Sequence, residues 1–437
     1  MSSSPPEAGA PAPRSTPSIW APPSPPPGAA PGLRWQLEAA LAAARSPEAP
    51  GAVRWIGAHL AEAEGLVRAA VEADPAGGAR LALSFGEVLD ILGGEEAHLR
   101  VTLLLERFRG RLPGPLADEV TLILVRDALR RRVGSDWAFE AEGVLERAEQ
   151  RRDPRLTAMA LRCLASAAWQ EGRAERSLSL ARRAGAVADP DLAARLVGNT
   201  LWGLGQHAEA EAAYVAGLAT PAARQDPLRA AALAANLGSL LAEQGRHAEA
   251  VRGFAFALRV YEAAGGQRPE QMLRCNLGMA LIDAGQLDEA EQHLQRAWTL
   301  RATLAGPNSE AGPVEGMIAL TLLRGRPAEA LNLLAAGSGV DDADPWYDGQ
   351  LMVWRAFALA GLGQLDRARE EALAGARRAA AVRDAEAGPL MAEVALAYID
   401  LRAGRPASLG LEAARAAAPR WQALRVALRL VDPPAGG

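Results

Sequence analysis

The sequence predicts an all-α protein, an α-solenoid of stacked helical hairpins that follows a disordered proline-rich tail. Three observations lead to this prediction. Glycines recur at nearly constant spacing, small residues accompany them at fixed offsets, and the chain is 49% hydrophobic but only 5% aromatic. Self-similarity at a period of roughly 20–50 residues is typical of stacked supersecondary units that share one continuous core.

The first segment, residues 1–32, holds eleven of the 30 prolines, as in WAPPSPPPGAAPG. Proline lacks the backbone N–H that a helix or a central strand needs, so we expect a disordered tail. Its PxxP spacings, such as Pro22 to Pro25, also fit a ligand of an SH3-like domain, although so biased a segment produces them by chance. No basic start precedes an apolar core, so we expect no secretory signal.

The second segment, residues 33–150, has helical periodicity without a clear repeat, and we expect degenerate helical hairpins there. Gly93 and Gly134 continue the glycine spacing of the following region backward. The third segment, residues 151–431, carries the repeat itself. NLGSLLAEQGRHAEA at 236–250 recurs as NLGMALIDAGQLDEA at 276–290. The predicted turn glycines are Gly172, Gly205, Gly245, Gly285, Gly325, Gly363 and Gly404.

The residue types at these positions have physical reasons. A glycine after a helix adopts the left-handed conformation that closes the last turn without a Cβ clash. Five residues later, where the two helices of a hairpin cross most closely, only a small side chain fits. These positions hold Ala210, Ala250, Ala290, Ala330 and Ala368, and Gly198, Gly238 and Gly278 have the same role seven residues before a turn glycine.

The order Leu237, Gly238, Leu241, Gly245, Ala250, Phe254, Ala257 resembles the tetratricopeptide repeat signature, and Leu277, Gly278, Leu281, Gly285, Ala290, Leu294, Ala297 repeats it. The preceding unit keeps Gly198, Leu201, Gly205, Ala210 and Tyr214. The period of about 40 residues is similar to a long variant with extended helices, since the usual period is about 34. The resemblance is strong over 190–300, good over 155–190 and 310–420, and weak before 150.

Residues 52–150 have a looser likeness. They resemble the helical segment that follows the nucleotide-binding domain in bacterial signal-transducing ATPases and in LuxR-type and maltose-regulon-type transcription regulators. In those proteins a helical bundle leads into repeats that sense a ligand or a partner. The ATPase and DNA-binding domains are missing here, so the resemblance implies only a regulatory repeat region.

Composition excludes several kinds of chemistry. All 47 basic residues are arginine, so no Walker, Schiff-base or kinase lysine exists. The net charge of −5 gives no general attraction to nucleic acid or anionic lipid. Cys163 and Cys275 follow no metal or disulfide spacing and are expected to be buried. No apolar run is long enough to span a membrane, so we expect a cytoplasmic protein.

The remaining candidate motifs are interpreted as structural. GLGQHAEA at 203–210 follows a helix rather than a strand, which excludes a dinucleotide loop. The histidines, among them His207 and His247 at equivalent turn positions, show no metal-ligand spacing, and we expect these two to be solvent-exposed. The acidic loop 339–349 lacks calcium-loop spacing and more simply caps a helix. The cluster Arg130, Arg131, Arg132, Arg151 and Arg152 is offset by glutamates. We therefore expect no cofactor, no metal, no direct nucleic-acid binding and no enzyme.

The candidate site follows from the resemblance, because the first helix of each tetratricopeptide repeat lines the inner surface. Alignment on the turn glycines puts Arg195, Asn199, Asn236 and Asn276 at inner positions that related proteins use to hold a peptide or its terminal carboxylate. A basic residue of that family is replaced by Met272. An asparagine amide can bond both polar groups of a peptide unit. Alternatively, these asparagines bridge neighbouring repeats or are simply solvated.

The predicted function is a non-catalytic protein–protein interaction scaffold or adaptor that binds a partner peptide segment in the concave groove. The alternative is a sensory or regulatory repeat module, related to ATPase-type transcription regulators, that acts on a partner protein or binds a small effector. The sequence does not identify the partner, the pathway or the oligomeric state.

Overall fold

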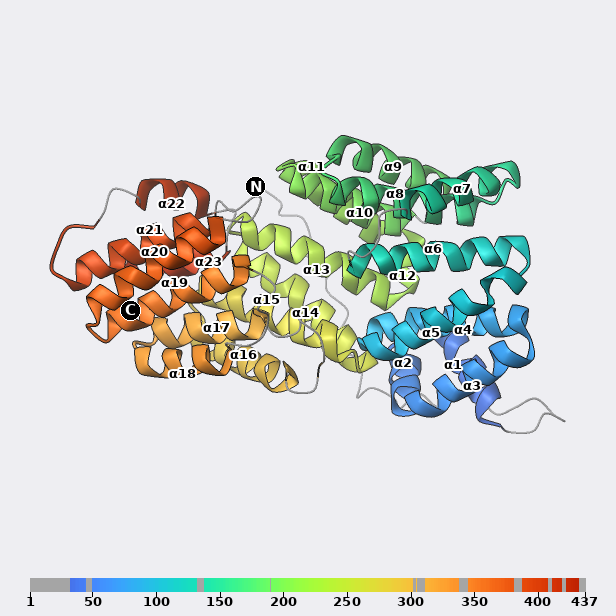
Figure 1. Ribbon diagram of the computed structural model, residues 1–437, viewed down its shortest axis with the longest axis horizontal. Helices are drawn as coiled ribbons and strands as arrows, with labels where there is room; N and C mark the ends of the chain where they lie inside the picture. Colours follow the sequence, from blue (N-terminus) through green and yellow to red (C-terminus); the bar gives the residue numbers. More distant parts are fainter. Residues whose placement is uncertain are drawn as a thin grey trace, which may run out of the picture.

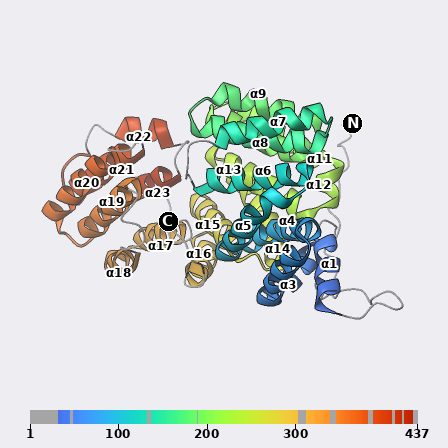
Figure 2. The same cartoon turned by 45° about the vertical axis from the view of Figure 1, so that its right-hand side comes forward.

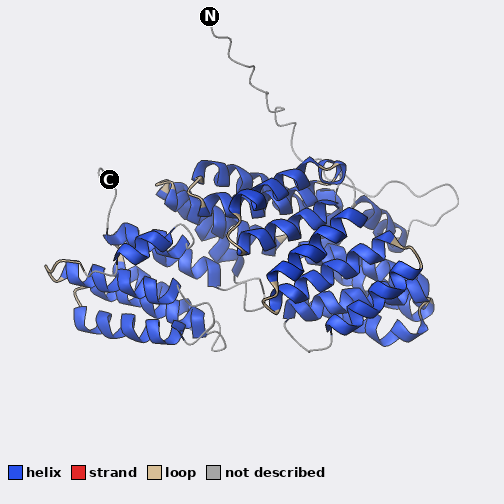
Figure 3. Ribbon diagram, turned by 90° about the horizontal axis from the view of Figure 1, so that it is seen from above, coloured by secondary structure: helices blue, strands red, loops and turns tan. Residues whose placement is uncertain are grey.

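The computed structural model describes residues 32–44, 49–131, 137–188, 190–301, 304, 311–337, 345–380, 387–407, 411–418 and 422–431. In these ranges the regular structure is helical throughout, without a strand (Figure 3), which confirms the predicted all-α class. The proline-rich tail up to Pro31, Gly134, Arg132 and the loop aspartates Asp341, Asp342 and Asp344 lie outside the described residues.

The N-terminal helices form a bundle with a core of its own, in which Val53, Phe85 and Leu105 are buried. The helices are α1 (Leu33–Ala43), α2 (Ala49–Ala58), α3 (Leu60–Ala73), α4 (Pro75–Leu92), α5 (Glu95–Phe108) and the 3-10 turn η1 (Arg109–Arg111). Asp74 caps α4 by accepting a hydrogen bond from the Ala76 N–H at 3.2 Å. Two further helices, α6 (Gly114–Arg131) and α7 (Trp137–Gln150), lead from this bundle into the repeats.

Seven helical hairpins follow in the described part of the chain. They are α8 (Pro154–Gln170) with α9 (Ala174–Val187), α10 (Pro190–Gly203) with α11 (His207–Ala219), α13 (Pro227–Glu243) with α14 (His247–Ala264), α15 (Gln267–Asp283) with α16 (Leu287–Arg301), α17 (Ala311–Leu323) with α18 (Pro327–Gly337), α19 (Pro345–Gly361) with α20 (Leu365–Ala380), and α21 (Ala387–Arg402) with α22 (Leu411–Ala417). All seven predicted turn glycines have positive φ, between 69° and 82°. The predicted hairpin register is therefore confirmed.

The predicted small residues lie where the two helices of a hairpin meet. The five turn-following alanines, Ala210 to Ala368, are completely buried. A Cβ at Gly198 would lie 2.4 Å from the Tyr214 ring, and one at Gly278 would lie 2.6 Å from Leu294. Atoms cannot approach so closely, so a larger side chain at either position must push the two helices apart.

The array curves toward the first helices of its hairpins. First helices of successive hairpins pack directly on one another, from α8 through α10, α13, α15, α17 and α19 to α21. Each second helix packs on the first helix of the next hairpin instead. The first helices are thus the more closely spaced layer, and we call the side they form the inner face (Figure 1).

Two long-range contacts go beyond a simple stack of hairpins. The N-terminal bundle packs back on the repeats: α2 contacts α13 and α14, and α4 contacts α14 and α15 (Figure 2). Arg54 donates to the Glu262 carbonyl, and Arg268 pairs with Glu95 at 2.9 Å. At the other end a last helix, α23 (Gln422–Val431), packs on α15, α17, α21 and α22. A short helix, α12 (Pro221–Gln225), lies between the second and third hairpins.

Candidate partner-binding face

The four residues predicted to bind a partner all lie on first helices of three successive hairpins. Arg195 and Asn199 are one turn apart on α10, Asn236 is on α13, and Asn276 is on α15. Arg195 and Asn199 are exposed, whereas Asn236 and Asn276 are half-buried. Whether these residues bind a partner stays a prediction.

The structure joins two of the four directly. The Asn199 Oδ1 accepts a hydrogen bond from the Tyr214 hydroxyl at 2.6 Å and another from the Asn236 Nδ2 at 2.9 Å. Tyr214 is completely buried, so it fixes the orientation of the Asn199 amide. One of the alternatives from the sequence, an asparagine bridge between neighbouring repeats, is therefore present. Because its oxygen is already engaged, Asn199 turns its two Nδ2 protons toward a ligand or solvent, while Asn236 keeps its Oδ1 as an acceptor.

Arg195 lies in basic surroundings. Its side chain is exposed, and no carboxylate of the described residues pairs with it. Desolvation by the surrounding protein lowers the pKa of its guanidinium. The positive charges of Arg162 and Arg130 lower this pKa further, whereas Tyr261 and Asp191 raise it. These groups come from α6, α8 and α14 and from α10 itself. Asp191 itself pairs with Arg229 at 3.1 Å.

The position one turn before each asparagine changes character along the inner face. It is Arg195 on α10, the half-buried Ala232 on α13, and Met272 on α15, which is 55% exposed. An exposed methionine is an adaptable apolar contact. A segment lying along these three helices would therefore meet a cation, then a small residue, then an apolar side chain.

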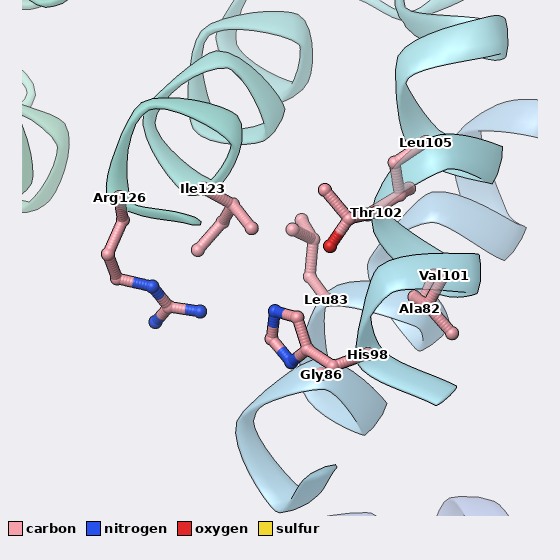
Figure 4. A pocket seen from close by; sticks show the side chains of 9 residues that line it. All are labelled: Ala82, Leu83, Gly86, His98, Val101, Thr102, Leu105, Ile123 and Arg126. Carbon is pink, nitrogen blue, oxygen red and sulfur yellow. The ribbon is translucent and has the colours of Figure 1, made fainter. Parts of the chain in front are cut away.

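A second polar cluster lies between α4, α5 and α6 (Figure 4). The His98 Nε2 is 2.7 Å from the Asp127 Oδ2, its Nδ1 is 3.2 Å from the Asp90 Oδ1, and Thr102 donates to Asp127 at 2.8 Å. Burial works to raise the pKa of Asp127, but the bond and charge of His98, with Arg126, lower it to about 2. The adjacent cavity of about 10 Å³ has room for one water. This cluster joins three helices through buried polar contacts.

The expectation for two histidines was wrong. His207 and His247 are half-buried rather than fully exposed. The His207 Nε2 lies 3.7 Å from the Glu243 Oε1, and the His247 Nδ1 lies 3.9 Å from the Asp283 Oδ2. Both carboxylates end the first helix of the next hairpin, so the 40-residue period repeats the same contact. The equivalent spacing of Glu243 and Asp283 was the signal for it.

The other residues singled out from the sequence have structural roles. Cys163 and Cys275 are buried as predicted, and burial raises the pKa of their thiols to about 11 and about 12. Arg130 pairs with Asp90 at 2.7 Å and Arg151 with Asp118. Asp348 of the acidic loop region pairs with Arg378 at 3.1 Å.

Two kinds of feature are absent from the described part of the chain. No helix there is long and apolar enough to cross a membrane. No group of three or more His, Cys, Asp and Glu side chains in those ranges is placed to hold a metal ion.

Comparison with known proteins supports the repeat assignment. The tetratricopeptide repeat family model matches residues 229–297, from the first turn of α13 into α16. No curated protein sequence matches the chain. The apo form of RapI is similar in structure, with 12% identity, a TM-score of 0.55, and coverage of 80% of this chain and 97% of RapI. A Rap protein complexed with competence and sporulation factor has 13% identity, a TM-score of 0.51, and coverage of 81% and 99%.

At these identities the likeness to solved structures concerns the fold, and the proposed likeness of residues 52–150 to ATPase-type regulators stays a prediction. The sequence match, however, covers two hairpins whose turn glycine with positive φ recurs in the other five described hairpins, and whose buried alanine recurs in three of them. The chain therefore contains tetratricopeptide repeats, which the family model places at residues 229–297.

Proposed function

We propose that this chain is a non-catalytic scaffold or adaptor that holds a segment of a partner protein on its inner face. Tetratricopeptide-like repeats of this kind form extended concave surfaces suited to protein interaction. The observation that carries the proposal is Arg195, an exposed guanidinium without a carboxylate partner among the described residues, beside the oriented Asn199–Asn236 pair. An unpaired cation in basic surroundings is a binding site for an anionic group.

The chemistry of the pair matches an extended peptide. The Asn199 Nδ2 can donate to a peptide carbonyl, and the Asn236 Oδ1 can accept from a peptide N–H. Arg195, one turn away on the same helix, would hold an acidic side chain or a terminal carboxylate. Asn276 and Met272 extend this surface onto α15. The partner segment is therefore extended and carries a negative charge near the α10 end.

The Rap protein of similar fold was crystallised with competence and sporulation factor, so a repeat array of this general shape can hold a partner. This supports the coarser part of the proposal, a protein-interaction scaffold. The finer part rests on the inner-face residues of this chain alone.

The test is affinity capture from host lysate, analysed by mass spectrometry. The wild type is compared with an Arg195→Ala/Asn236→Ala/Asn276→Ala variant. Arg252→Ala serves as the matched control, because Arg252 is an exposed arginine on the second helix α14. A protein held by the wild type and the control, and lost by a still-folded triple variant, is the expected result. Fluorescence anisotropy with a labelled segment of that protein should then show at least a tenfold weaker affinity for Arg195→Ala alone.

Equal capture by all three proteins would contradict the proposal and direct attention to residues 33–150. If nothing is captured, the alternative of a module that binds a small effector gains support. That alternative also predicts a shift in melting temperature when a metabolite fraction of the lysate is added, because a ligand that binds only the folded state stabilises it.

A further inference from the structure

The last helix, α23, is held in an unusual way. It lies beyond the seven hairpins and returns over their first helices, so that its contacts are with α21, α17 and α15 as well as the adjacent α22 (Figure 1). In Figure 2 it again lies between α21 and α15. A helix that merely covered the end of the array would leave one face in water. No residue from Ala423 to Val431 is fully exposed.

The contacts of α23 are of two kinds. Its apolar residues Leu424, Val426, Ala427 and Val431 are buried in the same core as the repeats. Its two arginines, one turn apart, contact the C-terminal end of α15. The Arg425 Nε and Nη2 each lie 3.1 Å from the Asp283 Oδ2, and Arg429 donates to the Ile282 carbonyl. Cations suit the C-terminal end of a helix, where free carbonyls carry partial negative charge.

The surface beneath α23 requires an apolar stripe and arginines in any helix that binds there. Only 3% of the Asp283 side chain is exposed, and the His247 ring, whose pKa is lowered by burial, is 3.9 Å away. A helix that covered Asp283 without a guanidinium would leave a buried carboxylate unpaired, which is strongly unfavourable. An occupant of this surface therefore needs an apolar stripe and two arginines spaced one turn apart.

The helix itself has little independent stability. Isolated helices shorter than roughly 12–15 residues are marginal in water, and α23 has 10 residues. Its structure depends on contacts to α15, 142 residues away in the sequence at the Arg425–Asp283 pair. The seven hairpins, by contrast, carry their own turn glycines and paired helices.

From these observations we propose that the surface formed by α15, α17 and α21 is a helix-binding site, with α23 as its internal and displaceable ligand. Its external partner is a basic amphipathic helix with an apolar stripe and two arginines one turn apart. This site differs from the face around Arg195, and the proposal does not depend on the proposed function.

The test uses a fluorescein-labelled peptide with the α23 sequence QALRVALRLV and the full-length chain. Arg425→Glu places a carboxylate against Asp283 and should release α23 from its site. We expect this variant to bind the peptide at least tenfold more tightly than the wild type does, by fluorescence anisotropy. A peptide carrying Arg425→Glu should not bind. Arg367→Glu, at an exposed arginine of α20, and Arg195→Ala should both behave as the wild type.

Equal peptide binding by wild type and a folded Arg425→Glu variant would overturn the proposal, because α23 would then be a fixed part of the fold. If Arg425→Glu fails to fold, hydrogen exchange of the wild type decides. The α23 amides should exchange at least tenfold faster than those of α21, and equal rates would refute displacement.

Discussion

Residues that lie between the two helices of a hairpin determine how closely these helices pack. Ala250 is completely buried, and its carbonyl lies 3.3 Å from the position of a Cβ on Gly238. We expect Ala250→Leu to lower the free energy of unfolding by roughly 1–3 kcal/mol through overpacking. Urea unfolding followed by circular dichroism measures this. Ala248→Leu, on the exposed side of the same turn, should change little, and equal effects of the two substitutions would contradict the register.

Single positions were also the most predictable part of the molecule. Turn glycines and crossing alanines follow from local sterics, so their spacing alone determined where each hairpin bends. The candidate site was predictable to the level of the helix and its inner face, because Asn236 and Asn276 occupy repeat-equivalent positions on α13 and α15. Its surroundings were not. Tyr261 on α14 and Arg162 on α8 affect the pKa of Arg195, and no spacing in the sequence indicates this effect.

At the level of elements, buried charge pairs join helices that the repeat pattern does not pair. Asp127 on α6 is bound by His98 on α5, and its pKa is about 2 instead of 3.8. A carboxyl whose folded pKa is lowered contributes stability above its unfolded pKa, and that contribution is lost as pH falls. Here it is present above about pH 4, disappears between about pH 4 and 2, and amounts to about 2 kcal/mol at neutral pH.

Asp127→Asn should therefore reduce the unfolding free energy by about 2 kcal/mol at pH 7 and by much less at pH 2.5. Urea unfolding at pH 7, 4 and 2.5 tests this. The control is Asp366→Asn, which changes an exposed aspartate in the first turn of α20. A pH-independent difference between wild type and Asp127→Asn would show that packing, not charge, explains the loss.

Elements outside the repeat were the hardest to predict. The repeat period predicted helices in pairs, but α12 and α23 are single helices that belong to none of the seven hairpins. The position of α23 depends on Arg425 meeting Asp283 across 142 residues, and an amphipathic pattern in α23 says only that one face is covered. Long-range contacts of this kind leave no local spacing to detect.

The whole molecule is shaped by the return of the N-terminal bundle onto α14 and α15. Gly93, which ends α4 with φ of 77°, lies directly against α15, since a Cβ there would lie 2.6 Å from the Cβ of Arg268. Gly172 has φ of 74° at an equivalent helix end, and a Cβ there meets nothing within 4 Å. The two glycines thus have similar backbone conformations but different surroundings.

Comparing Gly93→Ala with Gly172→Ala isolates the effect of the contact between the N-terminal bundle and α15. Each alanine should cost roughly 1–2 kcal/mol of stability for the left-handed backbone, and Gly93→Ala should cost more because it pushes α4 from Arg268. Hydrogen exchange should quicken in α2 and at the end of α14 for Gly93→Ala only. Equal stability losses with unchanged exchange would mean that the bundle is not held there.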